Sequence, residues 1–325
     1  MAAPTSVPLR AGASLGAGRR PVLLGLAGDS ASGKSTLTRG IEWILGPDRV
    51  TGICADDYHR YDRKQRMELG LTPLDPSAND IGLLERHVRR LATGLTVVKP
   101  VYDHSTGGFG EPERVEPREI VILEGLLPFH TAALRDHLDV KVYLDPEEEL
   151  RHRWKIERDC AERGYLMEEV VSDLRRREAD AATHVRPQRD FADLVVRFHR
   201  QEADDPWTGL GSRIAFRPTL PYPELRDLVA SLPRNGDRPV RFLLGRDAGW
   251  PDPVVEIDGD CPPALGARIE EAVWRSLVPG HGLDRDQIGR YRLPTGEERR
   301  GEALALAQLL IVFHLAGALR GALEL

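Results

Sequence analysis

The segment GDSASGKST, residues 28–36, gives the strongest indication of how this chain folds. It fits the pattern G-x-x-x-x-G-K-[ST], in which glycines let backbone N–H groups turn inward around a phosphate. An apolar run, 21–28, precedes it, and apolar residues at helical spacing follow it over 34–45. The sequence therefore predicts a phosphate-binding loop between a buried strand and a helix whose N-terminus adds partial positive charge. The residues expected to surround the phosphates of ATP are Gly28, Asp29, Ser30, Ala31, Ser32, Gly33, Lys34, Ser35 and Thr36.

Two side chains of this loop carry its chemistry, and they predict ATP and Mg²⁺ as the cofactors. Lys34 should reach the β- and γ-phosphates and act in catalysis, and the Ser35 hydroxyl should ligate Mg²⁺. GTPases and motor ATPases share such a loop. However, the sequence has no N-K-x-D motif, and the apolar run 119–125 ends in L-E-G rather than in D-E. The pattern favours a kinase, with Glu124 at a strand end as a second metal-associated group. The alternative is that Glu124 is a solvated acid.

Outward from the loop, predicted strands alternate with predicted helices. This alternation is typical of an α/β fold, a doubly wound and mostly parallel sheet with its site at the carboxyl ends of the strands. The expected strands are 21–28, 50–55, 119–125, 140–144 and 194–198, and the expected helices are 34–45, 80–95 and a long charged helix that ends at Arg163.

The residue pattern of the sequence changes after about residue 205. Prolines punctuate short β-rich runs, 240–244 and 254–257, and two helices are expected over 265–277 and 302–319. We expect a kinase core over 21–204 and a mixed α+β C-terminal region, 205–325, packed on it. The last helix contains an apolar run, but this run is shorter than the roughly 20 residues that a membrane span needs, so a buried helix is expected.

Composition excludes several classes of protein. The 325-residue chain has a formal net charge of −6, so nucleic-acid binding is not expected, and no membrane span is expected either. Three cysteines are too few for a disulfide framework, which indicates a reducing, cytoplasmic setting. Residues 1–20 hold three arginines and no acids but no apolar signal-peptide core. We expect a flexible tail there, with a transit peptide as the alternative.

Asp56 and Asp57 lie at the tip of the second predicted strand, next to the phosphate-binding loop in a doubly wound sheet. Phosphoryl transfer to an alcohol needs a carboxylate within hydrogen-bond reach of the hydroxyl. We expect one of the two acids to be the base and the other to lie near metal or substrate. The alternative is an Asp-rich turn.

Downstream cations suit an acceptor that carries a phosphate, since the planar fork of arginine fits a phosphate ester. On composition alone they could equally be solvated surface charges. The charged helix that ends at Arg163 is expected to be a mobile lid that brings cations to the γ-phosphate. The candidate cations are His59, Arg63, His104, Lys155, Arg158 and Arg163.

Taken together, these segments resemble the phosphoribulokinase/uridine kinase family of P-loop kinases, and within it the plant and cyanobacterial class of phosphoribulokinases. Besides the loop, the matching segments are D-D-Y-H at 56–59 with D-R-K at 62–64, L-D-P-x-A-N at 74–79, K-P-V-Y-D-H at 99–104, and W-K-I-x-R-D at 154–159. The resemblance covers about residues 20–200 well and the remainder weakly.

The resemblance implies ATP-dependent phosphorylation of a small sugar phosphate, ribulose 5-phosphate, to the 1,5-bisphosphate of carbon fixation, by a possible homodimer. It implies that Asp56 is the catalytic base and that Arg158 and Arg163 act from the lid. The implied substrate contacts are His59, Arg63, Tyr102, His104, Lys155 and Asp159. Alternatives are a uridine or nucleoside kinase, a kinase of another small sugar, and a nucleotide-binding protein that has lost catalysis. Uridine kinases lack the D-Y-H-x-x-D-R segment.

The sequence departs from the family pattern at two places. The family's E-G-L-H-P segment reads E-G-L-L-P here, so Leu127 replaces an imidazole and leaves room for an altered acceptor. Redox-regulated plant enzymes pair a loop cysteine with one just before D-D-Y-H. Cys54 fills the second position but Ser32 fills the first, so we expect no such disulfide switch.

Overall fold

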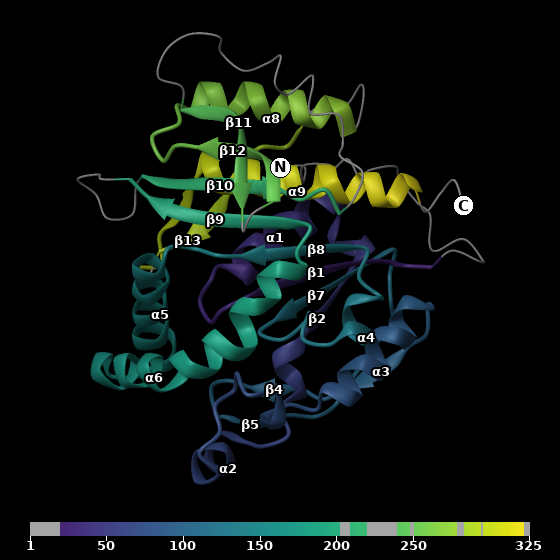
Figure 1. The fold of residues 1–325 in the computed structure, drawn as a ribbon, viewed down its shortest axis with the longest axis vertical. Coiled ribbons are helices and arrows are strands. Elements are labelled where there is room, and N and C mark those ends of the chain that lie inside the picture. The colour runs from purple at the N-terminus through teal and green to yellow at the C-terminus, as the bar shows by residue number, and fades with distance from the viewer. Residues whose placement is uncertain are drawn as a thin grey trace, which may run out of the picture.

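The computed structural model describes residues 20–201, 209–219, 239–247, 250–277, 283–293 and 295–321. Figure 1 shows a large twisted sheet with helices on both of its faces. The tail expected over residues 1–20 lies outside the described residues except for Arg20.

The sheet has the order β11-β12-β10-β9-β8-β1-β7-β2. Strands β2, β7, β1, β8 and β9 are parallel, and β10, β12 and β11 add an antiparallel edge. The predicted α/β fold with a mostly parallel sheet is confirmed. The strand bounds are β1 Val22–Gly28, β2 Val50–Cys54, β7 Ile120–Gly125, β8 Val140–Leu144, β9 Leu194–Arg200, β10 Leu210–Phe216, β11 Val240–Asp247 and β12 Trp250–Ile257.

Helices cover both faces because the central strands are apolar on both sides. In β1, Leu24 and Leu26 face the core beneath α1, α8 and α9, whereas Leu23 faces the core beneath α3 and α4. The helix bounds are α1 Lys34–Leu45, α2 Arg63–Glu68, α3 Ile81–Ala92, α4 Ala132–Arg135, α5 Glu148–Arg163, α6 Met167–Asp180, α8 Pro263–Leu277 and α9 Glu302–Gly321.

Short two-stranded ribbons flank the main sheet. The first two, β3 with β6 and β4 with β5, precede β7 in the chain, and the third, β13 with β14, follows α8. Their bounds are β3 Val97–Lys99, β4 Tyr102–Asp103, β5 Gly108–Phe109, β6 Glu113–Val115, β13 Arg290–Arg292 and β14 Glu298–Arg300.

The C-terminal region continues the main sheet instead of forming a sheet of its own. β10 pairs with β9 along its whole length, from Leu210 opposite Arg200 to Phe216 opposite Leu194. The last helix, α9, is buried along most of its length and packs on α1 and β10. Within the described residues, none of the helices combines the length and the apolar character that crossing a bilayer requires.

Candidate active site

A large cleft, with a volume of about 1250 Å³, opens at the carboxyl ends of the parallel strands. The phosphate-binding loop leaves β1 in the middle of the sheet, so the cleft has two halves, one beyond β7 and β2 and the other beyond β8 and β9. This volume exceeds that of most single-ligand sites, about 300–1,000 Å³, and suits two substrates side by side.

The loop has the backbone that its glycines predict. A Cβ on Gly28 would lie 2.7 Å from the carbonyl oxygen of Leu144, so no larger residue fits beside β8. Gly33 has φ 91° immediately before α1, in the left-handed region that glycine tolerates without a steric cost. Ala31 also has a positive φ, 62°, which marks a strained turn around the phosphate position.

Lys34 lies over the loop at the start of α1. Its Nζ donates to the carbonyl oxygens of Gly28 (2.8 Å) and Asp29 (2.9 Å). An ammonium group has three donors, so a third can point to a ligand in the cleft. Burial lowers the pKa of Lys34, an effect that the nearby Asp56 and Glu124 carboxylates oppose. A bound polyphosphate would add further negative charge and favour the protonated form.

Glu124 lies near the carboxyl end of β7, beside the loop, and two hydroxyl groups of α1 orient its carboxylate. Ser35 Oγ donates to Oε1 (3.2 Å) and Thr38 Oγ1 donates to Oε2 (2.8 Å). A hydroxyl and a carboxylate oxygen this close are hard ligands of the kind Mg²⁺ prefers, with water and phosphate completing its shell. The predicted pair therefore fits the metal. Thr38 was not predicted from the sequence as part of this site, although its place three residues after Ser35 puts it on the same helix face.

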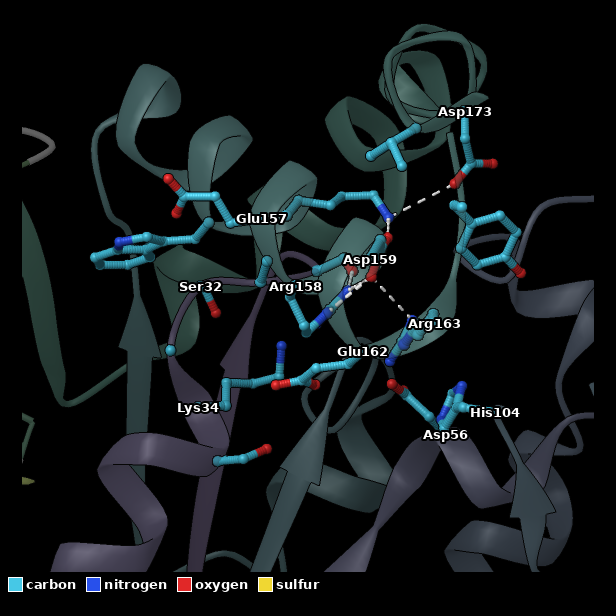
Figure 2. Close-up of a pocket in the computed structure, with 18 of the residues that line it drawn as sticks. Ser32, Lys34, Asp56, His104, Glu157, Arg158, Asp159, Glu162, Arg163 and Asp173 are labelled. Atoms are coloured by element: carbon cyan, nitrogen blue, oxygen red, sulfur yellow. Dashed lines mark hydrogen bonds and ion pairs between the residues drawn. The ribbon is translucent and has the colours of Figure 1, made fainter. Parts of the chain in front are cut away.

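Asp56 and Asp57, adjacent in sequence, point to different places. Asp56 lines the cleft, where its Oδ1 accepts a hydrogen bond from the Leu126 amide (3.1 Å). Gly125 makes room for it, because a Cβ there would lie 2.6 Å from Ala55 Cβ and 3.1 Å from Asp56 Oδ1. Asp56 thus keeps an oxygen available at the centre of the site (Figure 2).

Asp57 does not line the cleft, which corrects the expectation that the second acid lies near metal or substrate. It is buried, and its Oδ2 accepts a hydrogen bond from Lys99 Nζ at 2.6 Å while its Oδ1 accepts one from the Tyr102 amide at 2.9 Å. These contacts anchor the segment around β4. A buried charge needs such a partner, and the pairing with Lys99 keeps the Asp57 carboxylate out of the cleft.

His59, Tyr102 and His104 form a row of edge-to-face rings beside Asp56. The ring centroids of His59 and His104 lie 4.7 and 5.0 Å from that of Tyr102. His59 Nδ1 also bonds to Asn79 Oδ1 at 2.6 Å. Burial lowers the pKa of His104, and it lowers that of His59 to about 4. Both imidazoles are therefore neutral near pH 7, not cationic as the sequence suggested, and can exchange hydrogen bonds with hydroxyl groups.

Arginines of α2 lie next to this row. Arg63 Nη2 donates to the carbonyl oxygen of His104 at 2.5 Å, and Gly107 leaves space for it, since a Cβ there would lie 2.8 Å from Arg63 atoms. Arg66 was missed. It is buried, it lines the cleft, and its Nη2 donates to the Tyr102 hydroxyl at 2.6 Å. Its position three residues after Arg63 on one short helix could have indicated that both arginines face the same way.

Lys155 and Asp159 form a buried ion pair on α5, with Nζ and Oδ2 2.6 Å apart. Asp159 also holds Arg158 at 2.8 Å and Arg163 at 3.3 Å. Burial disfavours its charge, but Arg158 and Lys155 still lower the pKa of Asp159. Although both residues line the cleft, their charged atoms face each other. We therefore propose that Lys155 and Asp159 position the lid arginines, in place of the expected direct contact with the acceptor.

An ion pair and a hydrogen bond connect helix α5 to the phosphate-binding loop. Arg151 Nη1 lies 3.3 Å from Asp29 Oδ2, with both side chains largely buried, and Arg158 Nη2 donates to Ser30 Oγ at 3.4 Å. Arg158 therefore lies between the loop and Asp159, near the expected position of the γ-phosphate (Figure 2).

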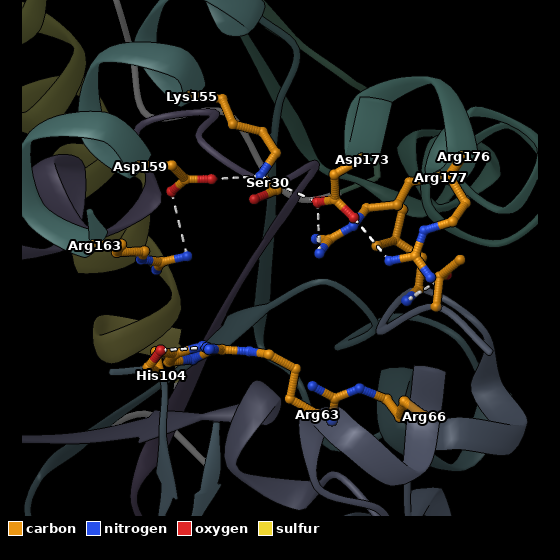
Figure 3. Close-up of polar contacts among 12 residues, drawn as sticks. Ser30, Arg63, Arg66, His104, Lys155, Asp159, Arg163, Asp173, Arg176 and Arg177 are labelled. Atoms are coloured by element: carbon orange, nitrogen blue, oxygen red, sulfur yellow. Dashed lines mark hydrogen bonds and ion pairs between the residues drawn. The ribbon is translucent and has the colours of Figure 1, made fainter. Parts of the chain in front are cut away.

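A second group of arginines comes from α6 and was not predicted. Arg176 and Arg177 line the cleft and pair with Asp173 at 2.9 and 2.7 Å. Figure 3 shows them on the wall opposite Arg63 and Arg66. The signal was the run Arg175–Arg177, but nothing local indicated that it would face the cleft.

Known proteins share this chain's kinase region. A family model described as "Phosphoribulokinase / Uridine kinase family" matches residues 23–203. A phosphoribulokinase of Synechocystis sp. is 42% identical over 178 residues, 55% of this chain and 54% of that protein. The chloroplastic phosphoribulokinase of Arabidopsis thaliana is 38% identical over 192 residues, 54% of this chain and 49% of that protein.

More distant relatives match as well. A uridine kinase of Ligilactobacillus salivarius is 33% identical over 182 residues, 54% of this chain and 85% of that protein. A solved structure of phosphoribulokinase from Rhodobacter spheroides superposes with a TM-score of 0.54 at 19% identity, covering 80% of this chain and 98% of that one, which shows a shared fold. The matched region spans about half the length of the curated phosphoribulokinases above.

Proposed function

The chain belongs to the phosphoribulokinase/uridine kinase family, and on this premise we propose that it transfers the γ-phosphoryl group of ATP to ribulose 5-phosphate in carbon fixation. The observation that carries the proposal is the arrangement around Asp56. This carboxylate lies between the phosphate-binding loop and a half of the cleft lined by neutral imidazoles and by arginines.

On the donor side, the protein acts by holding the phosphates of ATP in place. The loop amides and Lys34 hold the phosphates, and Arg158 approaches from α5, so charge that develops on the transferred group meets fixed cations. Ser35 and Glu124 would hold Mg²⁺, which when bound neutralises charge on the phosphate oxygens.

The acceptor half needs a base and a set of groups that orient a polyol. Asp56 accepts the proton of the attacking hydroxyl as the new P–O bond forms and the bond from the γ-phosphorus to the bridging oxygen breaks, which releases ADP. His59 and His104, neutral and held edge-on by Tyr102, are suited to hydrogen bonding with the sugar's hydroxyl groups. Most of the acceleration is expected from proximity and orientation of the two substrates.

The arginines favour a phosphorylated acceptor over a neutral nucleoside. Arg63, Arg163, Arg176 and Arg177 converge on the acceptor half from both walls (Figure 3). Arginine forks bind a phosphate monoester through paired, charge-assisted hydrogen bonds, which a nucleoside's sugar cannot match.

The Leu127 departure does not argue for a different acceptor. Leu127 is buried in a small core with Leu74 and Val185 and does not line the cleft. The apolar side chain therefore fills a packing position outside the cleft lining.

An assay that couples ADP release to a spectroscopic signal tests the proposal. Ribulose 5-phosphate, ribose 5-phosphate and uridine are offered as acceptors to the purified chain, with the variants Lys34→Ala and Asp56→Asn as controls. We expect kcat/KM to be at least tenfold higher with ribulose 5-phosphate, and turnover to fall by at least about 100-fold in either variant. Higher kcat/KM with uridine, or full activity of Asp56→Asn, would refute it.

A further inference from the structure

We infer that the half of the cleft beyond β8 and β9 is an apolar slot for the nucleotide's purine base, with Trp154 of α5 as its stacking residue. This inference rests on the proposed function, because it assigns the donor's base to the half of the cleft that the acceptor does not use. It names a determinant of donor binding that the phosphate-binding loop does not supply.

The two halves of the cleft differ in chemistry. The acceptor half, beyond β7 and β2, is rich in imidazoles, carboxylates and guanidinium groups. The other half is largely aromatic and aliphatic, with two arginines at its margin, and its lining comes from five secondary-structure elements. Its lining residues are Trp154 of α5, Phe198 of β9, Leu210 of β10, Tyr291 and Leu293 at β13, and Leu304 of α9.

Trp154 occupies the junction between this slot and the phosphates. Its Cζ3 atom lies 3.9 Å from the Cβ position of Gly33, so the indole borders the phosphate-binding loop itself. On its other side it meets the ring of Phe198 edge-to-face, with centroids 6.3 Å apart. The indole is only partly buried, so a planar group whose phosphates sit in the loop can stack on it.

The far wall of the slot is held rigidly in place. The β13–β14 ribbon is fixed to α8 through Glu270, whose carboxylate is fully buried and bonds to Arg285 (2.6 Å) and Arg300 (2.5 Å). Figure 1 shows β13 beside the edge of the sheet at which β9 ends, above α5. A pre-formed wall binds a planar ligand without first paying the entropy of ordering it.

The wall lies outside the part of the chain that the family model covers. That match ends at residue 203, whereas Leu210, Leu293 and Leu304 all follow it. The C-terminal region therefore has a role in the site as well as in the sheet, since it encloses the donor's base.

Calorimetric titration of the full chain with Mg²⁺-ADP and with Mg²⁺-pyrophosphate tests the inference without measuring turnover. Both probes engage the loop, but only ADP carries a base. Aromatic stacking on a base contributes enough that its removal should weaken ADP binding by roughly 5- to 100-fold. We expect Trp154→Ala to show this loss with pyrophosphate affinity changed by less than about threefold. Trp154→Phe should retain most of the ADP affinity.

Two further variants sharpen the test. Leu210→Ala, in a different element of the slot, should also weaken ADP binding selectively, whereas Phe191→Ala, an exposed aromatic that does not line the cleft, should change neither affinity. Equal loss of both probes in Trp154→Ala, or no loss of either, would overturn the inference and leave the proposed function standing. Failure of the unaltered chain to bind either probe would overturn both.

Discussion

The contact between α1 and the C-terminal helix α9 gives a prediction about stability. Gly40 on α1 faces Gln308 on α9, and a Cβ at residue 40 would lie 2.1 Å from both Cδ and Nε2 of that amide. The amide is fully buried, donates to the Thr36 carbonyl oxygen (3.2 Å) and accepts from the Gly289 amide (2.7 Å). Gly40→Ala must therefore displace a side chain that is bonded on both sides.

The size of the effect follows from three opposing contributions. Overpacking a tight core costs about 1–3 kcal/mol. Loss of the buried hydrogen bond to Gly289 adds about 1–2 kcal/mol, since its amide has no access to water. Alanine gains about 1 kcal/mol over glycine within a helix. We expect the free energy of unfolding of Gly40→Ala to fall by about 2 kcal/mol.

Urea denaturation followed by circular dichroism measures this change, and the chain offers a matched control. Gly317 on α9 is exposed, and a Cβ there would meet nothing within 4 Å. Gly317→Ala should therefore raise the free energy of unfolding by up to about 1 kcal/mol, the opposite sign for the same substitution. The double variant Gly40→Ala, Gln308→Ala should be destabilised less than the sum of the two single variants. A Gly40→Ala chain as stable as Gly317→Ala would show that the Gln308 amide does not oppose a methyl group at residue 40.

Three other measurements test the assignment of charges. Asp57→Asn should lower the free energy of unfolding by about 3 kcal/mol, because the buried Lys99 ammonium loses its closer partner, whereas Asp56→Asn should change it by less than about 1 kcal/mol. Glu124→Gln should reduce turnover by at least about 100-fold and raise the Mg²⁺ concentration needed for half-maximal activity, as measured in a Mg²⁺ titration. The native pKa of His59 is about 4, below its usual 6.5, so the unfolded chain takes up this proton first and stability is lost as pH falls between those values. Urea denaturation at pH 7 and pH 5 should show a smaller loss for His59→Gln than for the unaltered chain.

Each of these has an outcome that contradicts it. Equal unfolding free energies for the Asp56 and Asp57 variants would mean that the buried pair with Lys99 contributes nothing specific. An unchanged Mg²⁺ requirement in Glu124→Gln would remove this residue from the metal site. A His59→Gln chain that loses as much stability as the original between pH 7 and pH 5 would assign the pH dependence to other groups.

Features that depend on local contacts could be predicted from the amino-acid sequence. The phosphate-binding loop, the buried strands on either side and the alternation of strands with helices could be predicted because each depends on residues within a few positions of one another. The position of Asp56 at a strand end was also predictable, since parallel strands present their carboxyl ends at one edge of the sheet.

Long-range contacts in the folded chain determine which of several similar side chains face the cleft and which charge each of them carries. Asp57 is adjacent to Asp56, but a lysine 42 positions away in the sequence draws it into the core. His59 is neutral because distant segments bury it. Leu293 borders the cleft because a buried glutamate on α8 fixes its ribbon there. Burial and pairing arise from contacts between segments far apart in the chain, and no local pattern records them.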